Sequence, residues 1–229
     1  MEELEEKKEY KMPLIGDPAP SFKAVTTQGE INFPQDYKGK WVILFSHPAD
    51  FTPVCTTEFI TFASMIDEFR KLNTELIGLS VDSLYAHIAW LRTIQEKIEW
   101  KGHKNVEVTF PLIEDIKMEV ANKFGMIHPN QSTSQAVRAV FIIDPRAIIR
   151  AILYYPSSTG RNFDEIKRLV LALQKADKDK VATPADWRPG DDCIIPPPGS
   201  CGTAKERMET KEEDKYCLDW FLCFRKEKK

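Results

Sequence analysis

The sequence predicts an α/β fold, with a central sheet that carries helices on both of its faces. Short apolar runs of strand length alternate along the chain with longer segments in which apolar residues recur at helical spacing. Read in order, these segments give the succession β-α-β-α-β-α-β-β-α, which indicates a sheet flanked by helices. Prolines become frequent after about residue 181, and they predict an extended C-terminal arm beyond the folded core.

The first half of the core contains two buried strands and two helices. Residues 41–46 (WVILFS) and 76–81 (LIGLSV) are continuous apolar runs, which is typical of buried strands. A helix is expected to follow each strand. The apolar positions that share one face of the first helix are Phe59, Phe62, Ala63, Ile66 and Phe69. Those expected to share one face of the second helix, at residues 84–98, are Ile88, Leu91, Ile94 and Gln95.

The second half continues the alternation. A short strand is expected at residues 110–113, and a short helix at residues 116–124 that ends before Gly125. Two further strands, at residues 139–143 and 148–154, flank an Asp-Pro turn and should pair as a hairpin.

The last core helix is expected to begin at Asn162, a good N-cap residue, and to run to about Asp177. The arm that follows contains a proline triplet at residues 196–198 and ends in a cluster of aromatic residues, which predicts that it docks on its own domain or on a partner subunit. We therefore expect three parts, which are a lead-in at residues 1–12, a folded domain at residues 13–180 and an extension at residues 181–229.

Composition and charge exclude several classes of function. The chain has 229 residues and a net charge of −3, so nothing in its charge favours nucleic acid or anionic lipid as a partner. No apolar run approaches the ~20 residues that span a membrane. The charged N-terminal segment lacks the apolar stretch of a secretory signal. The expected location is the cytoplasm.

The five cysteines are unevenly spaced. One, Cys55, stands alone, and the others crowd the C-terminal region at Cys193, Cys201, Cys217 and Cys223. A reducing cytoplasm argues against a static disulfide framework, so this pattern suggests redox chemistry. Zinc is an alternative, but the gaps of seven, fifteen and five intervening residues fit no C-x-x-C pair. The absence of C-x-x-C also counts against a thiol–disulfide oxidoreductase.

Local sequence places Cys55 at the start of a helix. Thr52 is a typical N-cap residue, and Pro53 is favoured at the first helical position. Cys55 would then occupy about the third position, where the free backbone N–H groups and the positive end of the helix dipole favour a thiolate. The thiolate is the nucleophilic form of cysteine. The alternative is that Cys55 is a small buried apolar residue.

The residues around Cys55 resemble a known family. Pro48, Thr52 and Cys55 form the pattern P-x-x-x-T-x-x-C, which is the signature of the peroxiredoxins, and the segment HPADFTPVCTTE resembles their one-cysteine subfamily. The resemblance covers roughly residues 13–191. Further segments that match the subfamily are SVDS with AHIAW at 80–90, RAVFIIDP at 138–145, LYYPSSTGRNFDEI at 153–166 and VATPADWRPGD at 181–191.

The resemblance implies a thioredoxin-like fold and assigns roles within the site. Cys55 would be the peroxidatic cysteine that becomes a sulfenic acid when it attacks a peroxide. Thr52 would offer its hydroxyl to the peroxide and the thiolate, and Pro48 would shield the sulfur from water. Arg138 would favour the thiolate and hold the peroxide. From the residues alone, Arg138 could instead be a surface arginine at the end of a strand.

Two further residues are candidates for the same site. His47 lies at the end of the first core strand, where it is either structural or a hydrogen-bond partner of the peroxide or the oxidised sulfur. Arg161 resembles a second arginine of the subfamily and is expected to support the pocket. Residues 36–41 hold no serine and the chain has no nucleophile elbow, so the phospholipase activity of some one-cysteine relatives is not expected.

The C-terminal segment YCLDWFLC departs from a strict one-cysteine enzyme. It resembles the tail of prokaryotic members that use a C-terminal resolving cysteine. Cys223 is the favoured resolving residue, and Cys217 is a relay or the alternative resolving residue. Both could instead be packing residues among the aromatic side chains. No role transfers to Cys193 or Cys201.

These observations together predict a thiol-dependent peroxidase without a bound cofactor or metal. It would reduce hydrogen peroxide and alkyl hydroperoxides through a sulfenic acid at Cys55, resolved by a tail cysteine of the partner subunit, and a thioredoxin-type dithiol would recycle it. The arm is expected to wrap a second subunit, and the family suggests rings of dimers. The alternatives are a redox-sensing or chaperone-like thiol assembly, and a strict one-cysteine peroxidase that uses an external thiol.

Overall fold

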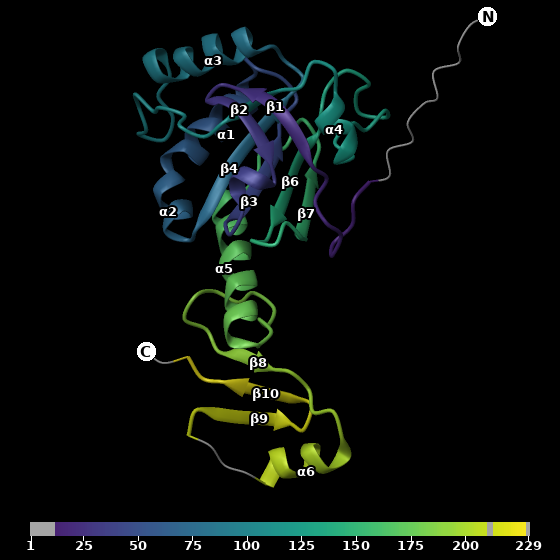
Figure 1. Cartoon of the computed structure of the whole chain (residues 1–229). Coiled ribbons are helices and arrows are strands. Elements are labelled where there is room, and N and C mark those ends of the chain that lie inside the picture. The colour runs from purple at the N-terminus through teal and green to yellow at the C-terminus, as the bar shows by residue number, and fades with distance from the viewer. Residues whose placement is uncertain (1–11, 210–212, 228–229) are drawn as a thin grey trace, which may run out of the picture. The chain divides into compact units, whose positions relative to one another are not determined.

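The structure of the chain is a computed structural model that describes residues 12–209 and 213–227. Of the expected lead-in at residues 1–12, all but Met12 lies outside the described residues. The chain divides into two compact units, with the boundary between Arg161 and Asn162. Both units are drawn in Figure 1.

The first unit is built, within the described residues, on a seven-stranded sheet with the strand order β2-β1-β5-β4-β3-β6-β7 (Figure 1). The strands are β1 (Phe22–Thr26), β2 (Gly29–Phe33), β3 (Trp41–Ser46), β4 (Thr74–Ser80), β5 (Leu112–Glu114), β6 (Arg138–Ile143) and β7 (Ile149–Tyr155). The β1–β2 hairpin at one edge was not foreseen from the sequence. The other five strands lie where apolar runs predict them, with β3 at the predicted residues and the ends of the other four displaced by at most two residues.

The sheet is mixed. Strands β3, β4 and β5 are parallel, whereas β6 runs antiparallel to β3 and forms an antiparallel hairpin with β7. Every residue of β3 is buried, because this strand lies in the middle of the sheet between β4 and β6. In the register, Ile43 pairs with Leu76 on one side and Ile142 on the other. The carboxyl end of β3 and the start of β6 are therefore neighbours.

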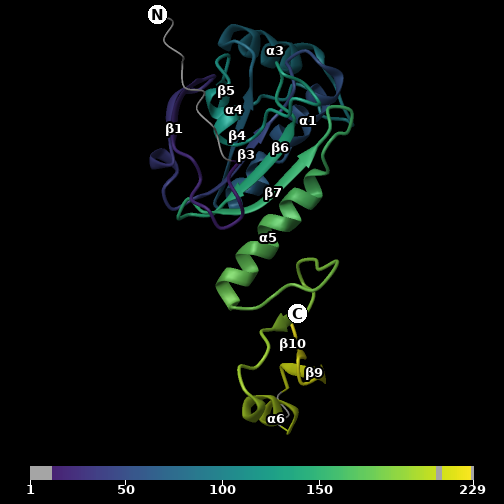
Figure 2. The ribbon, with the colours of Figure 1, turned by 90° about the vertical axis from the view of Figure 1, so that its right-hand side faces the viewer.

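Helices flank this sheet, as the alternation of elements predicts (Figures 1 and 2). They are α1 (Pro53–Ser64), α2 (Ile66–Lys71), α3 (Leu84–Lys97) and α4 (Glu119–Lys123), with a short 3₁₀ turn at Gln35–Tyr37. The helical pattern over residues 59–69 is shared between α1 and α2, because the backbone leaves helical geometry at Met65. Helix α2 contacts β4, and α3 contacts β5.

The buried face of α3 differs from the expected one. Ile88 and Gln95 are exposed, and the buried side chains of α3 are His87, Trp90 and Ile94. These lie at i, i+3 and i+7, so the spacing is helical but the face is rotated by one residue. The reason is that His87 occupies a core position, and a pattern of apolar residues does not predict burial of a histidine. His87 is anchored by hydrogen bonds and not by apolar contact alone.

Aromatic rings fix the position of α1 against the sheet. The Phe45 ring of β3 lies 4.6 Å from the Phe62 ring and 5.6 Å from the Phe59 ring, measured between centroids. Phe110 lies 5.6 Å from both Phe45 and Phe59. Phe45, Phe59 and Phe62 are fully buried. Because aromatic packing of this kind tolerates little displacement, the first turn of α1 has a defined place at the end of β3.

The second unit begins with the long helix α5 (Phe163–Asp179). The expected N-cap is confirmed, since the side chain of Asn162 accepts a hydrogen bond from the backbone N–H of Glu165 at 3.2 Å. The helix ends two residues later than expected, and Lys180 follows it in the left-handed region. Beyond it lie β8 (Cys193–Ile195), α6 (Cys201–Glu209), β9 (Lys215–Asp219) and β10 (Leu222–Arg225).

The arm is more structured than the proline content suggests. Strands β8, β10 and β9 form a three-stranded antiparallel sheet, and a small apolar cluster of Ala172, Val181, Trp187 and Cys193 joins it to α5. The indole N–H of Trp187 donates to the carbonyl of Asp191 at 3.1 Å. The prolines exclude helix only where they stand, so α6 forms directly after them.

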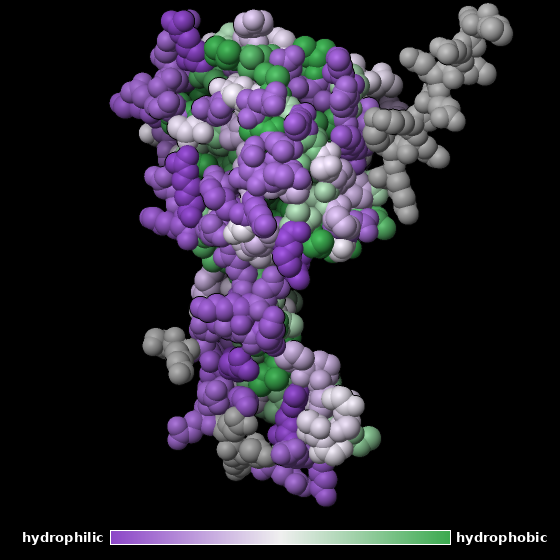
Figure 3. All heavy atoms as spheres, viewed as in Figure 1, coloured by the Kyte–Doolittle hydropathy of each residue, from purple (hydrophilic) through white to green (hydrophobic). Residues whose placement is uncertain are grey.

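Hydrophilic side chains predominate on the face of the molecule seen in Figure 3. Across residues 12–209 and 213–227, none of the helices combines the length and the apolar character that crossing a bilayer requires.

Candidate active site

Cys55 is the third residue of α1. Strand β3 ends at Ser46, a short loop follows, and Thr52 has the extended backbone of an N-cap residue with Pro53 at the first helical position. Both local predictions are confirmed. The Thr52 hydroxyl does not cap the helix, however, because it donates to the carbonyl of Ala49 at 2.8 Å. Cys55 is a free thiol with no exposed surface.

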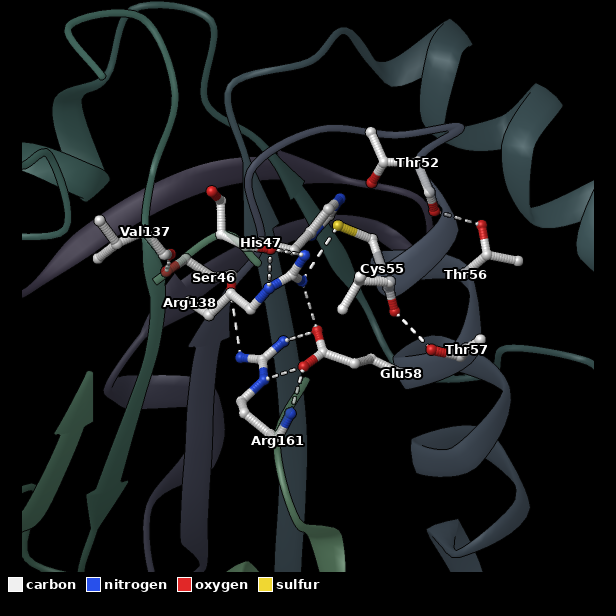
Figure 4. A network of polar contacts seen from close by, with 12 residues as sticks. Ser46, His47, Thr52, Cys55, Thr56, Thr57, Glu58, Val137, Arg138 and Arg161 are labelled. Atoms are coloured by element: carbon white, nitrogen blue, oxygen red, sulfur yellow. Dashed lines mark hydrogen bonds and ion pairs between the residues drawn. The ribbon is translucent and has the colours of Figure 1, made fainter. Parts of the chain in front are cut away.

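Arg138 lies beside the Cys55 sulfur (Figure 4). It is the first residue of β6, the strand that pairs with β3, and its Nη1 is 3.2 Å from Sγ of Cys55. Two further hydrogen bonds, from Nε at 3.1 Å and Nη2 at 2.8 Å, go to the carbonyl of Ser157. The side chain is 2% exposed, so the alternative of a surface arginine is wrong.

Glu58 joins two buried arginines. Its Oε2 accepts from Nη1 of Arg138 at 2.7 Å and from Nη2 of Arg161 at 2.6 Å, and its Oε1 accepts from Nε of Arg161 at 2.9 Å (Figure 4). The backbone N–H of Arg161 also donates to Oε1, at 2.8 Å. Burial by itself raises the pKa of a carboxyl, but the guanidinium groups of Arg161 and Arg138 hold the pKa of Glu58 below its usual value.

Arg161 ties helix α1 to two strands of the sheet. Its Nη1 donates to the carbonyl of Ser46 at 3.0 Å and to that of Ala139 at 3.1 Å, and its guanidinium lies 5.2 Å from the centre of the Phe45 ring. It does not touch the sulfur through any hydrogen bond among the described residues. Arg161 therefore contacts the cluster through Glu58 and not through the sulfur. This position is consistent with the supporting role expected from the sequence.

The charges of Arg138, Arg161 and Glu58 do not sum to zero. Arg138 and Arg161 contribute two buried positive charges, and Glu58 contributes one negative charge. One positive charge is left over, and the guanidinium nitrogen that faces Cys55 carries part of it. An uncompensated buried charge is costly, so the cluster favours an anionic sulfur at Cys55. The α1 N-terminus acts in the same direction.

A second polar cluster surrounds His47. Its Nε2 lies 2.9 Å from Oδ1 of Asp50, and Nδ1 of His87 lies 2.7 Å from Oδ2 of the same carboxylate. Burial lowers the pKa of His47 below its usual value, although Asp50 opposes this. Burial raises the pKa of a carboxyl, yet hydrogen bonds from His47 and His87 bring the pKa of Asp50 below its usual value. Pro48, next to His47, is also buried.

His47, Asp50 and Asp82 are the one group in the described residues whose ligand atoms lie close enough for a metal ion, within 4.8 Å of one another. Nε2 of His47 and both oxygens of Asp50 are already engaged in hydrogen bonds. Oδ2 of Asp82 accepts from the backbone N–H of Asp50 at 3.0 Å and from the hydroxyl of Ser80 at 2.6 Å. The donor set therefore fits a hydrogen-bond network better than a metal site.

The structure brings Cys55, Arg138 and Arg161 into one network through Glu58, and it places His47 in a separate cluster with Asp50 and His87. The sequence reasoning missed Glu58, Asp50 and His87. Glu58 had a local signal, because it lies one helical turn after Cys55 on a face that is otherwise apolar. Asp50 and His87 had none, because their significance depends on contacts across 37 positions of sequence.

The tail cysteines belong to the second unit. Cys217 and Cys223 face each other on β9 and β10 and form a disulfide. Cys193 is a buried free thiol, and burial raises its pKa above the usual value. Cys201 is an exposed free thiol at the start of α6. The disulfide removes two of the four thiols that the zinc alternative needs, and it is not the simple apolar packing considered from the sequence.

Comparison with known proteins identifies the family. Residues 15–152 match the AhpC/TSA family, and residues 172–211 match the C-terminal domain of 1-Cys peroxiredoxin. A peroxiredoxin of Methanosarcina mazei is 71% identical over 216 residues, covering 94% of this chain and 99% of the relative. A peroxiredoxin of Aquifex aeolicus is 52% identical over 225 residues, covering 94% and 97%.

Solved structures agree with the sequence comparison. A yeast mitochondrial 1-Cys peroxiredoxin, studied for its thiol resolving mechanism via glutathione/thioredoxin systems, matches with a TM-score of 0.80 at 43% identity over 94% of this chain and all of its own. A cysteine-to-serine mutant of the peroxiredoxin 6 of Arenicola marina matches with a TM-score of 0.80 at 35% identity, covering 95% of this chain and 100% of its own. The expected thioredoxin-like fold is confirmed. The chain belongs to the peroxiredoxin family and is an oxidoreductase with thiol peroxidase activity.

Proposed function

We propose that Cys55 is the peroxidatic residue and that Arg138 is its electrostatic partner. The observation that supports this most directly is the 3.2 Å separation between Nη1 of Arg138 and Sγ of Cys55, at the start of a helix and in a buried cluster with excess positive charge. A guanidinium there favours the thiolate before the reaction and the leaving oxygen during it.

The proposed first step is a displacement at oxygen. The Cys55 thiolate attacks the hydroxyl oxygen of hydrogen peroxide or an alkyl hydroperoxide, a sulfur–oxygen bond forms, and the oxygen–oxygen bond breaks. The electron pair leaves with the second oxygen, which takes up a proton to become water or an alcohol, and Cys55 is left as the sulfenic acid. No cofactor is required, because the sulfur supplies both electrons.

The loop before Cys55 is proposed to shape the peroxide site. The Thr52 hydroxyl donates to the carbonyl of Ala49, which leaves its oxygen lone pairs to accept a hydrogen bond from the peroxide. Pro48 is buried and has no N–H, so it covers the sulfur without competing for hydrogen bonds. His47 is proposed to hydrogen-bond the peroxide or the oxidised sulfur.

Resolution is proposed to use the tail of the partner subunit. The thiol of Cys223 condenses with the Cys55 sulfenic acid, which forms a mixed disulfide and releases water. Cys217 then attacks the Cys223 sulfur, so that Cys55 leaves as a thiolate and the tail retains a disulfide. The Cys217–Cys223 disulfide together with a free Cys55 is the state that this relay would end in, which supports the order.

A thioredoxin-type dithiol is the proposed reductant of that tail disulfide, since two electrons and two protons restore both thiols. The yeast mitochondrial relative uses glutathione/thioredoxin systems, which supports this class of reductant. Peroxiredoxins typically form dimers. We extend this to a dimer in which residues 181–229 act as an exchanged extension of the peroxidase domain at residues 13–180, with such dimers assembling in rings.

A strict one-cysteine peroxidase is the second candidate, because residues 172–211 match the C-terminal domain of 1-Cys peroxiredoxin. In that case an external thiol would attack the sulfenic acid of Cys55 directly.

Both candidates require Cys55, so steady-state peroxide consumption by a Cys55→Ser variant is the primary test. Serine is not ionised near neutral pH, and less than about a tenth of wild-type turnover is expected. Cys201→Ser, which alters an exposed thiol, is the matched control and should retain turnover. Full activity of Cys55→Ser would overturn the proposal.

A further inference from the structure

A single buried carboxylate holds two histidines near the peroxidatic cysteine. Asp50 lies in the loop between β3 and α1, and its two oxygens are divided between His47 at 2.9 Å and His87 of α3 at 2.7 Å. The side chains of both histidines are fully buried, and that of Asp50 is 2% exposed. Water therefore does not reach these side chains, and each of their hydrogens must be donated to a protein atom or a bound ligand.

The hydrogen bonds of His87 define its protons. Its Nε2 lies 3.1 Å from the carbonyl oxygen of Ile113, which can only accept, so Nε2 carries a hydrogen. Its Nδ1 faces Asp50, which is ionised because its pKa lies below the ordinary carboxyl value despite burial. An ionised carboxylate also only accepts, so Nδ1 carries a hydrogen as well. His87 is then an imidazolium, and Asp50 compensates its charge.

The same reasoning defines the tautomer of His47. Burial, with the neighbouring His87 acting in the same direction, lowers its pKa, so that ring is neutral and carries one hydrogen. Because Oδ1 of Asp50 only accepts, the hydrogen is on Nε2. Nδ1 therefore presents a bare lone pair. It is buried and is the one side-chain polar atom in the described residues that is buried with no hydrogen-bond partner.

An unpartnered buried acceptor is costly unless a ligand supplies the missing donor. Figure 4 shows the His47 ring reaching from the end of β3 toward the sulfur of Cys55. The rings of Phe59 and Trp90 lie 4.8 and 5.1 Å from it and hold its plane. The indole N–H of Trp90 is itself fixed by the hydroxyl of Thr56 at 3.2 Å. Packing therefore fixes the position of the ring, and what Nδ1 lacks is a hydrogen-bond donor.

We propose that Asp50 and His87 are positioning residues that hold His47 in the tautomer whose Nδ1 accepts a hydrogen bond from the hydroperoxide O–H at Cys55. This inference rests on the proposed function of Cys55. The hydrogen that is bound sits on the oxygen that the thiolate attacks. After the sulfur–oxygen bond forms and the oxygen–oxygen bond breaks, it remains on the sulfenic oxygen, and the departing oxygen takes its proton from water.

Arg138 and His47 would then contact different oxygens of the bound peroxide. Arg138, a donor only, faces the charge that develops on the departing oxygen, whereas His47 offers an acceptor to the hydroxyl oxygen. An alkyl hydroperoxide has one O–H and two oxygens with lone pairs, so this pair of contacts orients it end to end, whereas symmetric hydrogen peroxide can bind either way round. The opposite tautomer of His47 would present a second donor and lose that distinction.

The direct test is ¹⁵N NMR of the histidine side chains in the reduced wild-type protein, because a nitrogen that carries hydrogen and a nitrogen with a lone pair differ widely in chemical shift. The chain has four histidines, so a His103→Gln, His128→Gln variant leaves only the two rings in question. We expect His47 to carry hydrogen on Nε2 alone and His87 on both nitrogens. A His47 ring with hydrogen on Nδ1 would overturn the proposal, and this measurement needs no variant of the cluster to fold.

Substitution of Asp50 gives the kinetic test. In Asp50→Leu, which keeps the size of the side chain, both histidines lose the oxygen that accepts from them, so His47 is no longer held with its hydrogen on Nε2, and the second-order rate constant of Cys55 oxidation should fall about tenfold or more. His87→Gln keeps a donor to Asp50 and should retain the His47 tautomer and lose less. Asp82→Asn removes a nearby negative charge while its oxygen still accepts the same hydrogen bonds, so it is the matched control and should react within about twofold of wild type.

The outcomes separate this inference from the function on which it rests. A folded Asp50→Leu variant with the wild-type oxidation rate, alongside an inactive Cys55→Ser variant, would contradict the positioning role and leave the peroxidatic role intact. An active Cys55→Ser variant would contradict the peroxidatic role whatever the tautomer of His47.

Discussion

Nη1 of Arg138 lies 3.2 Å from Sγ of Cys55, although 83 positions separate the two residues in the chain. The same nitrogen is 2.7 Å from Oε2 of Glu58, so the carboxylate holds the guanidinium against the sulfur. Because Glu58 and Cys55 are one helical turn apart on α1, one short helix presents both the nucleophile and the group that orients its cationic partner.

Replacing Arg138 should slow the first oxidation step. In Arg138→Ala the positive charge beside the sulfur is lost, so we expect the rate constant for Cys55 oxidation by hydrogen peroxide to fall about 100-fold or more. Stopped-flow tryptophan fluorescence measures it. Arg146→Ala is the matched control, because Arg146 is an exposed arginine on the β6–β7 turn. An Arg138→Ala rate within about twofold of wild type would remove Arg138 from the mechanism.

Glu58→Gln should destabilise the protein. It leaves two buried guanidinium groups without their counter-charge, which costs about 3–5 kcal/mol at pH 7. Chemical denaturation at equilibrium measures the free energy of unfolding. Glu75→Gln is the matched control, because its ion pair with Lys40 is partly exposed and should contribute about 1 kcal/mol or less. Equal effects of the two substitutions would contradict a buried network.

The effect of Glu58 should depend on pH in a defined direction. The pKa of Glu58 is lower in the folded protein than the value of about 4.3 expected when unfolded. Its contribution to stability is therefore complete above about pH 4.3 and is lost as pH falls through the folded value. The difference in unfolding free energy between wild type and Glu58→Gln should be constant from pH 7 to about 5 and shrink at lower pH. A difference that grows on acidification would contradict this.

The resolving cysteine should be identifiable by mass spectrometry of peroxide-treated protein digested without reductant. In Cys217→Ser the relay stops at the first exchange, so a Cys55–Cys223 cross-linked peptide should accumulate. In Cys223→Ser, Cys55 should instead proceed to sulfinic acid. Sulfinic Cys55 with free tail thiols in the wild type would identify a strict one-cysteine enzyme.

The tail should stabilise a dimer. Leu218, Trp220 and Phe221 on the β9–β10 hairpin are exposed apolar side chains, which is typical of a contact surface. A chain ending at Ala182 should dissociate at higher concentration than the full chain in analytical ultracentrifugation. A Leu218→Ser, Trp220→Ser, Phe221→Ser variant keeps the small apolar cluster around Trp187 and should behave similarly. An unchanged oligomer in both would show that the tail is not an assembly arm.

Local sequence determined much of this protein. The run at residues 41–46 became the central strand, and Thr52, Pro53 and Cys55 took the predicted positions at the start of α1. Asn162 capped α5 as expected. These features depend on backbone preferences and on periodicity within a few residues, which is why a single sequence reveals them. The resemblance to the family added Arg138 and Arg161, which no local pattern would select.

Tertiary structure decided which polar groups meet. Glu58 matters because β6 and the segment just before α5 bring the guanidinium groups of Arg138 and Arg161 to it, and Asp50 matters because α3 turns His87 inward. The rotation of α3 itself could not be predicted, since a buried histidine is indistinguishable in sequence from an exposed one. Hydrogen bonds between distant segments carry no periodicity. Their partners are defined only when the sheet has fixed the distances between strand ends and helix starts.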